Sequence, residues 1–338
     1  MDNLLEIRNL SKSFTVTAHS LKGGRLRLQA VDNLSFSLRK GETFGLVGES
    51  GCGKSTVARL LLRLIEPDQG EILFDGTDLI SLSPARLRPY RKRLQMVFQD
   101  PYSSLNPRLR IGSAIGEALA IHRLAPPGEI RDRVGRLLAT VGLGAEHMDR
   151  FPHEFSGGQR QRIGIARALA VEPELIVADE PLSALDVSIQ AQIVNLFQDI
   201  QKDFGLTYLF ISHDLSVIEH ISDRVGVMYL GRIVELAGAE SLYRRPRHPY
   251  SESLLNAVPV ADPQRRRERP LLRGEIPSPL APPPGCPFHP RCRYAAEVCR
   301  RELPALEEKV PGHYAACHFS SQVGGDVFSA AASALPRN

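Results

Sequence analysis

A glycine-rich loop constrains the fold of this chain more than any other stretch. It reads "GESGCGKS" at residues 48–55 and fits the phosphate-loop pattern G-x-x-x-x-G-K-[ST]. The apolar "TFGLV" before it has the length of a buried strand, and "KSTVARLLLRLI" after it has the apolar spacing of a helix. Glycines let the backbone curl so that successive N–H groups face a phosphate, and the helix N-terminus adds partial positive charge. The sequence therefore predicts a nucleotide-binding strand–loop–helix unit within an α/β fold.

The polar residues of this loop have separate expected tasks. Lys54 is expected to meet the β- and γ-phosphates, and the hydroxyl of Ser55 to bind Mg²⁺. Cys52 stands at a variable position of the pattern, so we interpret it as a small loop residue and not as a metal ligand. The expected nucleotide-binding residues of this stretch are Gly48, Glu49, Ser50, Gly51, Cys52, Gly53, Lys54, Ser55 and Thr56.

Four residues outside the loop complete the expected catalytic set. The apolar run "LIVADE" ends in Asp179, which we expect to hold the magnesium, and Glu180, which we expect to be the general base. His213 follows the apolar "YLFIS" and could hydrogen-bond the γ-phosphate, although a histidine there is more often structural. Gln99 in "MVFQDP" could contact both Mg²⁺ and the attacking water; by itself it is a weak signal.

The remaining pattern predicts alternating layers. The first forty residues alternate apolar and polar positions, which is typical of antiparallel strands. Residues from about 91 to 164 have a mainly helical pattern broken by prolines, which indicates a separate helical lobe. The later runs "PELIVADE" and "LTYLFISHD" enclose the helix-like "SIQAQIVNLFQDIQKDF", so we expect a parallel sheet with crossover helices.

Composition excludes several classes of protein. Forty-two Lys and Arg against 38 Asp and Glu leave a formal charge of only +4, which disfavours a nucleic-acid-binding function despite the basic runs at 244–245 and 265–267. No run of about eighteen apolar residues suggests a membrane span, and the first residues do not resemble a signal peptide. We therefore expect the chain to remain in the cytosol, where its five cysteines are not expected to form stable disulfides.

A second glycine pair, "SGGQ" at residues 156–159, stands just before a helix-like stretch. A serine there is suited to cap the helix, and an ordinary N-cap by Ser156 is one interpretation. Exposed N–H groups at a helix N-terminus can also hold an anion, which would give the chain a second phosphate site. The residues alone leave both interpretations open.

Taken together, these stretches resemble the ATP-binding subunits of ABC transporters over about residues 1 to 260. The motifs occur in the family's order: the phosphate loop, Gln99, "SGGQ", Asp179-Glu180, "SALD" at 183–186, and His213. The resemblance implies that two such subunits pack head to tail, so that the "SGGQ" of each serves the ATP of the other. It also implies that Phe14 stacks on adenine, with a buried core phenylalanine as the alternative. The further contacts to nucleotide that it implies are Ser156, Gly157, Gly158, Gln159 and Asp186.

Several stretches resemble one branch in particular, the ATPase subunits of oligopeptide and dipeptide importers. These are "LVGESGCGKST", "MVFQDPYSSLNPR", "RHPYSESLL" and the cysteine-bearing tail. The branch implies a second ATPase subunit, often in a heterodimer, two permease subunits and an extracytoplasmic binding protein, at the cytoplasmic face of the inner membrane. It also implies that a short permease helix docks near residues 99–108. A DNA-repair or translation ATPase would need coiled-coil insertions or tandem domains, and a nonhydrolytic partner would have lost motifs that are intact here.

The tail carries four cysteines within about thirty residues. The spacing is x5, x6 and x17, which is wider than the paired spacing usual in zinc modules. An iron–sulfur cluster accepts wider spacing, and the branch resemblance points to a [4Fe-4S] cluster; zinc and free thiols are the alternatives. We expect His289, His313 and His318 to be bystanders. The expected ligands are Cys286, Cys292, Cys299 and Cys317.

These observations predict an ABC-type phosphate-loop domain with an N-terminal antiparallel β subdomain. We expect the ATPase domain to cover residues 1–240 with the helical lobe at about 91–164, a linker and regulatory extension to cover 241–284, a small cysteine-ligated module to cover 285–320, and a disordered tail to cover 321–338.

Overall fold

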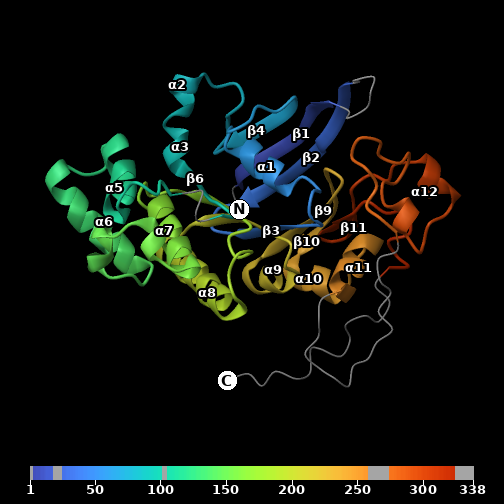
Figure 1. Cartoon of the computed structure of the whole chain (residues 1–338). Coiled ribbons are helices and arrows are strands. Elements are labelled where there is room, and N and C mark those ends of the chain that lie inside the picture. The colour runs from blue at the N-terminus through green and yellow to red at the C-terminus, as the bar shows by residue number, and fades with distance from the viewer. Residues whose placement is uncertain (1–2, 18–24, 101–104, 258–273, 324–338) are drawn as a thin grey trace, which may run out of the picture.

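The computed structural model describes residues 3–17, 25–100, 105–257 and 274–323 (Figure 1). The expected tail therefore lies largely outside the described residues, and so does the charged part of the expected linker, 258–273. Two β-sheets lie at the centre of the described chain. Helices and the C-terminal segments surround them.

The larger sheet has eight strands in the order β11-β12-β10-β9-β3-β8-β7-β6. The strands from β6 to β9 are parallel, and β10, β12 and β11 continue the sheet in antiparallel pairing. Since parallel strands end at the same edge, the loops after β3, β7, β8 and β6 meet there. The strands are β3 (Thr43–Val47), β6 (Leu94–Val97), β7 (Leu175–Asp179), β8 (Thr207–Ser212), β9 (Arg224–Tyr229), β10 (Arg232–Gly238), β11 (Glu307–Val310) and β12 (His313–Ala315).

Side chains of the parallel strands alternate between two cores, one on each face of the sheet. In β8, Tyr208 and Phe210 pack with the helical side, whereas Leu209 and Ile211 pack with the small sheet and the first helix. Every residue of β3, β7 and β8 is buried, as is typical of parallel strands covered on both faces. The expected parallel sheet is confirmed.

The smaller sheet is antiparallel, in the order β2-β1-β4-β5. Its apolar positions Leu5, Ile7 and Leu10 are buried against the larger sheet's core. The alternation in the first forty residues is therefore confirmed as antiparallel strands. The strands are β1 (Asn3–Thr17), β2 (Arg25–Arg39), β4 (Gln69–Phe74) and β5 (Thr77–Asp78).

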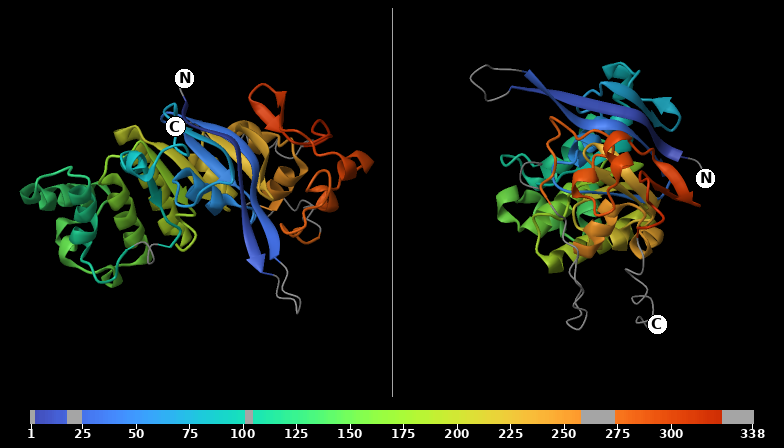
Figure 2. Two further views of the ribbon diagram at one scale, coloured as in Figure 1. Left: turned by 90° about the horizontal axis from the view of Figure 1, so that it is seen from above. Right: turned by 90° about the vertical axis from the view of Figure 1, so that its right-hand side faces the viewer.

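The helical lobe lies at one end of the molecule (Figure 2). Residues 94–97, which fall inside the lobe expected from about residue 91, form β6 and pair in parallel with β7. Four residues are too few to show a period, so the sequence did not separate this strand from the helices that follow. The helices before and within the lobe are α2 (Pro84–Leu87), α3 (Tyr90–Arg93), α5 (Ile111–Ile121), α6 (Ile130–Thr140) and α7 (Gly157–Leu169), with 3₁₀ turns η1 (Pro127–Glu129), η2 (Ala145–Asp149) and η3 (Pro152–Glu154).

Three further helices each follow a strand of the larger sheet. The loop of residues 48–53 leads into α1 (Lys54–Leu61), as the sequence predicted. The expected helix after "SALD" is α8 (Val187–Phe204), whose Phe197 packs edge-on against Tyr208 and Phe210. Helix α9 (Leu215–Ile221) follows β8, with Asp214 capping its first turn.

Residues 274–323 lie at the opposite end from the helical lobe (Figure 2). They are not detached from the ATPase core, because β12 pairs with β10 and thereby extends the larger sheet. Part of the expected linker is also ordered into helices, and Tyr250 there is fully buried. The elements are α10 (Ala239–Arg244), α11 (Pro249–Ala257), η4 (His289–Arg291) and α12 (Glu297–Arg301). In the described part of the chain, no helix has the length and apolar character needed to cross a membrane.

Candidate functional site

The loop between β3 and α1 depends on its glycines for its shape. Gly53 has a φ of 110°, and a Cβ there would lie 2.2 Å from the carbonyl oxygen of Ala30. A Cβ on Gly48 would lie 2.2 Å from the carbonyl oxygen of Met228. Neither position accepts a side chain unless the neighbouring backbone moves. The loop is therefore fixed against two backbone segments just before α1 begins.

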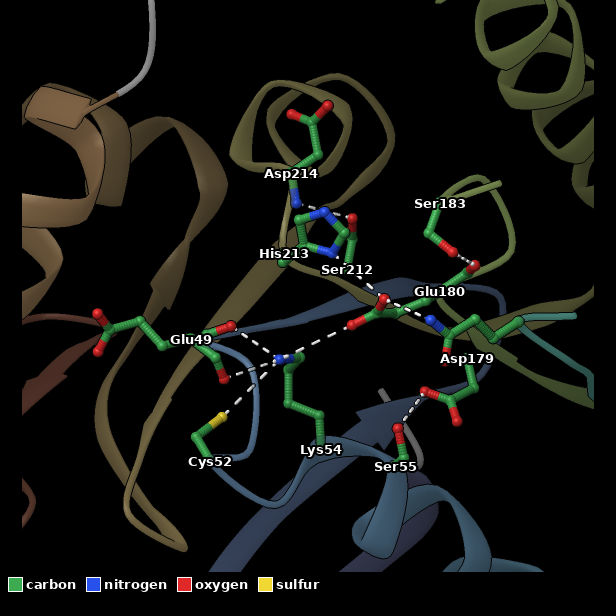
Figure 3. A network of polar contacts seen from close by, with 12 residues as sticks. Glu49, Cys52, Lys54, Ser55, Asp179, Glu180, Ser183, Ser212, His213 and Asp214 are labelled. Carbon is green, nitrogen blue, oxygen red and sulfur yellow. Dashed lines mark hydrogen bonds and ion pairs between the residues drawn. The ribbon is translucent and has the colours of Figure 1, made fainter. Parts of the chain in front are cut away.

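Lys54 points back into this loop (Figure 3). Its Nζ donates to the carbonyl oxygens of Gly48, over 2.7 Å, and Glu49, over 3.2 Å. The residue is only 4% exposed, so the ammonium group is held at the floor of the loop and not in bulk water. An ammonium in this place can turn from carbonyl oxygens to phosphate oxygens with little movement of the chain.

Several side chains converge on the carboxylate of Glu180 (Figure 3). Gln99 Nε2 donates to Glu180 Oε2 over 3.2 Å, and His213 Nδ1 lies 3.3 Å from the same oxygen. Lys54 Nζ lies 4.0 Å from the other carboxylate oxygen. Glu180 has a φ of 46°, an uncommon value for a residue with a side chain. The ends of the parallel strands thus bring together the residues that the sequence placed at the phosphates and at the attacking water.

Asp179 lies beside Ser55, and the Ser55 hydroxyl donates to Asp179 Oδ1 over 3.0 Å. Burial raises the pKa of Asp179, the neighbouring Glu180 charge adds to this rise, and the Ser55 hydrogen bond opposes it. A hydroxyl and a carboxylate oxygen are the kind of ligands that Mg²⁺ takes. These two side chains could hold the ion, whose charge would offset the cost of burying the carboxylate.

The stretch 156–159 forms a complete helix cap at the start of α7. Ser156 Oγ accepts from the backbone N–H of Gln159 over 3.3 Å, and Gln159 Oε1 accepts from the Ser156 N–H over 3.0 Å. The ordinary N-cap that the sequence offered as one interpretation is therefore present. Among hydrogen bonds that join described residues, none uses the N–H groups of Gly157 or Gly158, and none connects residues 156–159 with the loop 48–55. The two phosphate-suited stretches do not form one site in a single chain.

Two further residues predicted to contact nucleotide, Phe14 and Asp186, are exposed to solvent. Phe14 is 37% exposed, so it is not the buried core residue that was the alternative; its ring lies 5.6 Å from Lys12 Nζ. Asp186 precedes α8, and its side chain makes no capping hydrogen bond there. Neither residue contacts the cluster around Glu180 through a hydrogen bond among the described residues.

Comparison with known proteins decides the family. The ABC transporter family model matches residues 31–183, and the model of the oligopeptide/dipeptide transporter C-terminal region matches residues 234–299. The oligopeptide transport ATP-binding protein AppF of Bacillus subtilis is 54% identical over 323 residues, which cover 95% of this chain and 98% of that protein. The chain belongs to the ABC transporter family. It is an ABC-type ATPase.

Other members of the family support the same placement. A putative peptide import ATP-binding protein of Brucella ovis is 53% identical, over 93% of this chain and 97% of its own length. The fold matches the dimeric ABC transporter cassette MJ0796 with a TM-score of 0.62 and 27% identity, over 70% of this chain and 98% of that chain. The cbiO1 protein of Clostridium perfringens matches with the same TM-score and identity, over 72% and 91% of the two chains.

The four C-terminal cysteines of this ABC ATPase line one small cavity, together with aromatic and histidine side chains. Cys286 N–H donates to the carbonyl oxygen of Cys299 over 2.8 Å, which joins two of the segments that carry them. Burial raises the pKa of Cys292 to about 12 and that of Cys317 to about 11. Within the described ranges, no group of three or more His, Cys, Asp or Glu side chains is arranged to hold a metal ion. The structure thus brings the four predicted cysteines to one cavity, but they are not arranged to bind a single metal ion.

Sequence reasoning missed two residues that contact the phosphate loop. Arg291 forms a bidentate ion pair with the side chain of Glu49. Tyr250 Oη accepts a hydrogen bond from the Glu49 N–H over 2.8 Å. The positions of Arg291 and Glu49 differ by 242 in the sequence, so no local pattern could indicate the pair. The only signal was that both residues fall within stretches that resemble peptide-importer ATPases, "RHPYSESLL" and the cysteine-bearing tail.

Proposed function

We propose that this chain powers the import of oligopeptides, dipeptides or related small solutes as a peripheral ATPase subunit at the cytoplasmic face of the inner membrane. The observation that carries the hydrolytic part is the convergence of Gln99, His213 and Lys54 on Glu180, next to the Ser55–Asp179 pair. The peptide cargo is supported by relatives named as oligopeptide transport and peptide import proteins. Part of the proposal is the division into an ATPase domain at 1–240, an extension at 241–284 and a cysteine-bearing module at 285–320.

In the proposed reaction, the loop amides and Lys54 hold the phosphates, and Phe14 stacks on the adenine. Bound Mg²⁺, held by Ser55, Asp179 and Gln99, would neutralise phosphate charge. The oxygen of the attacking water bonds to the γ-phosphorus as the bond to the ADP oxygen breaks, Glu180 accepts the proton of the water, and His213 donates to the γ-phosphate. The Gln99 and His213 contacts then hold the Glu180 carboxylate in the orientation that this transfer needs.

The second phosphate-suited stretch implies a second ATPase subunit. In the proposed assembly, the N-terminus of α7 meets the γ-phosphate of an ATP bound to the partner. Its Gly157 and Gly158 amides support this, because they make no hydrogen bond among the described residues. The solved relative MJ0796 is described as dimeric, which supports this arrangement. We propose a heterodimer below two permease subunits, with an extracytoplasmic binding protein that delivers the cargo. Closing and opening of the ATPase pair would switch the permeases between two states.

An apolar groove next to Gln99 is the proposed docking site for a short cytoplasmic helix of a permease. Part of the surface expected for this helix, residues 101–104, lies outside the described residues. The groove has exposed apolar side chains, including Leu64 at 52% and Phe98 at 37%, and two of its other lining residues are Arg91 and Arg167. Because Phe98 precedes Gln99, a helix seated here would act directly on a residue that contacts Glu180. The groove is lined by Leu62, Leu64, Leu79, Leu87, Arg91, Leu94, Gln95, Met96, Phe98 and Arg167.

Phe98→Glu is expected to reduce peptide-coupled ATP hydrolysis in the assembled transporter by about tenfold or more, since a charge would replace an apolar anchor in the groove. ATP binding by the isolated chain should change little. Phe204→Glu is the matched control, because Phe204 is also exposed but lies outside the groove, at the end of α8. Equal coupled hydrolysis in the two variants would contradict the docking assignment.

The function as a whole is tested with the intact assembly in proteoliposomes. Purification by an affinity tag on this chain should recover two permease chains and a second ATPase. In the proteoliposomes, ATP should then drive uptake of labelled dipeptides or oligopeptides. Hydrolysis that no peptide stimulates and that drives no peptide uptake would contradict the proposed cargo while leaving the ATPase assignment intact.

For the cysteine-lined cavity we propose a [4Fe-4S] cluster, with a single Zn²⁺ as the alternative. Tetrahedral zinc, with Zn–S bonds of about 2.3 Å, needs four sulfurs close around one point. A cubane cluster instead takes one thiolate at each of four separated irons. Four cysteines line one cavity, and their spacing is wider than that of paired zinc ligands, which supports the cluster. When bound, the cluster would fix the segments that carry its ligands.

Protein purified without oxygen is expected to be brown, with broad visible absorption and about four irons per chain. Cys292→Ser should lose the colour and most of the iron. Cys52→Ser should keep both, because Cys52 lies in the phosphate loop and not at the cavity. Colourless wild-type protein with one zinc per chain would contradict the cluster and support the zinc site. Colourless wild-type protein without metal would show that the four cysteines are free thiols.

A further inference from the structure

Glu49, the second residue of the phosphate loop, is held from two sides by residues that follow position 240. Arg291 Nη1 donates to Glu49 Oε2 over 2.7 Å, and Arg291 Nη2 donates to Glu49 Oε1 over 3.0 Å. The backbone N–H of Glu49 donates to Tyr250 Oη over 2.8 Å. Both the side chain and the backbone of Glu49 are therefore fixed by the C-terminal part of the chain. The planar guanidinium makes this a two-point contact with a defined orientation.

Arg291 is itself held firmly. Its side chain is only 4% exposed, and its guanidinium lies 5.9 Å from the ring centre of Phe288 and 6.0 Å from that of Tyr229. The rings of Phe288, Tyr229 and Tyr250 pack against one another. An enclosed ion pair on an aromatic base is screened less by water than a surface pair, so breaking it has larger consequences.

Glu49 is also one contact away from the phosphate-binding lysine. Figure 3 shows that the Glu49 side chain points away from Lys54, whereas its carbonyl oxygen accepts from Lys54 Nζ over 3.2 Å. Rotation of Glu49 would move the carbonyl that holds the ammonium group. If Arg291 were absent, the unpaired Glu49 carboxylate could turn toward Lys54 and compete with phosphate for it. The ion pair therefore acts on both the shape and the charge of the loop.

We propose that Arg291 is a positioning residue for the phosphate loop and that it sets the ATP affinity of this chain through Glu49. The inference rests on the proposed role of residues 48–55 as the phosphate-binding loop. Arg291 lies between Cys286 and Cys292, both of which line the cysteine cavity. The segment that carries these cysteines is thereby linked to the nucleotide site.

Arg291→Gln in the full-length chain is expected to raise the dissociation constant of a fluorescent ATP analogue by about tenfold, within the usual range of coupling between sites. Arg291→Lys, which keeps the charge but not the two-point contact, should have an intermediate effect. Adding Glu49→Gln to Arg291→Gln should return the affinity to within about threefold of wild type, because the competing carboxylate is gone. In the assembled transporter, Arg291→Gln should raise KM for ATP about tenfold and change kcat by less than about twofold.

Arg224→Gln is the matched control. Arg224 pairs with the enclosed Glu42 over 3.0 Å at the opposite end of β3 from the loop, so its loss should lower thermal stability without changing ATP affinity. If Arg291→Gln and Arg224→Gln bind the analogue equally well, the proposal is wrong. It is also wrong if Glu49→Gln restores nothing in the double variant, since a purely structural role of Arg291 gives that result. Should Arg291→Gln fail to fold, the Lys variant decides: unchanged affinity there contradicts the proposal. Failure of the wild type to bind the analogue would instead contradict the assignment of the loop.

Discussion

Glu180→Gln is expected to reduce ATP turnover by about a hundredfold or more while ATP remains bound. A positioned general base contributes about 10²- to 10⁴-fold, and an amide cannot accept the proton of the attacking water. The glutamine keeps the size of the side chain and an oxygen for the contacts from Gln99 and His213, so the site should keep its shape. Lys54, Ser55 and the loop amides are untouched and should still bind the nucleotide.

The measurement is phosphate release in the assembled transporter, together with equilibrium binding of ATP. Because hydrolysis is what loosens the proposed ATPase pair, size-exclusion chromatography with ATP should show the Glu180→Gln variant trapped as the closed pair. Glu174→Gln is the matched control: it lies just before the start of β7, at the other end from Glu180, and pairs with Arg93. Near-normal hydrolysis in Glu180→Gln would show that another group accepts the proton.

The sequence predicted the nucleotide-binding part of the fold well because its signals are local. The strand, glycine loop and helix at residues 43–61 are contiguous, and each has its own period and turn residues. Asp179, Glu180 and His213 follow long apolar strands, and parallel strands that end at one edge bring such residues together. The prediction of their proximity therefore needed only the order of strands and helices.

The parts that the sequence did not predict depend on contacts between distant segments. Residues 94–97 become a strand only because β7 is available beside them, and β12 is a strand of three residues that pairs with β10. The pair of Arg291 with Glu49 arises in the same way, from the C-terminal extension of the sheet edge. Cysteine spacing indicated a shared site, whereas the contact of Arg291, one residue before Cys292, with the phosphate loop follows from packing that no spacing encodes.

Gly157→Asp should separate the two functions that we assign to the two phosphate-suited stretches. ATP binding by the isolated chain should be unchanged, because residues 156–159 make no hydrogen bond with the loop 48–55 among the described residues. Hydrolysis by the assembly should fall by about a hundredfold or more, the size of effect expected when stabilisation of a developing anion is lost. The new carboxylate would face the γ-phosphate of the partner's ATP. Repulsion at one of the two ATP sites opposes closure of the ATPase dimer, so both ATP sites should lose activity.

The substitution is not expected to harm folding, which makes the result interpretable. A carboxylate in the first turn of α7 suits the helix dipole, and Gly157 has an ordinary backbone conformation with only the flexible end of Leu185 nearby. Gly164→Asp is the matched control, since it adds the same charge to the same helix about two turns further on, where a Cβ meets no neighbour within 4 Å. Hydrolysis by a strictly monomeric preparation at the rate of the assembly would contradict the shared site, and so would equal activity of the two aspartate variants. Loss of activity in Gly157→Asp alone, with ATP still bound to the chain, would mean that the helix cap acts on a nucleotide held by another subunit.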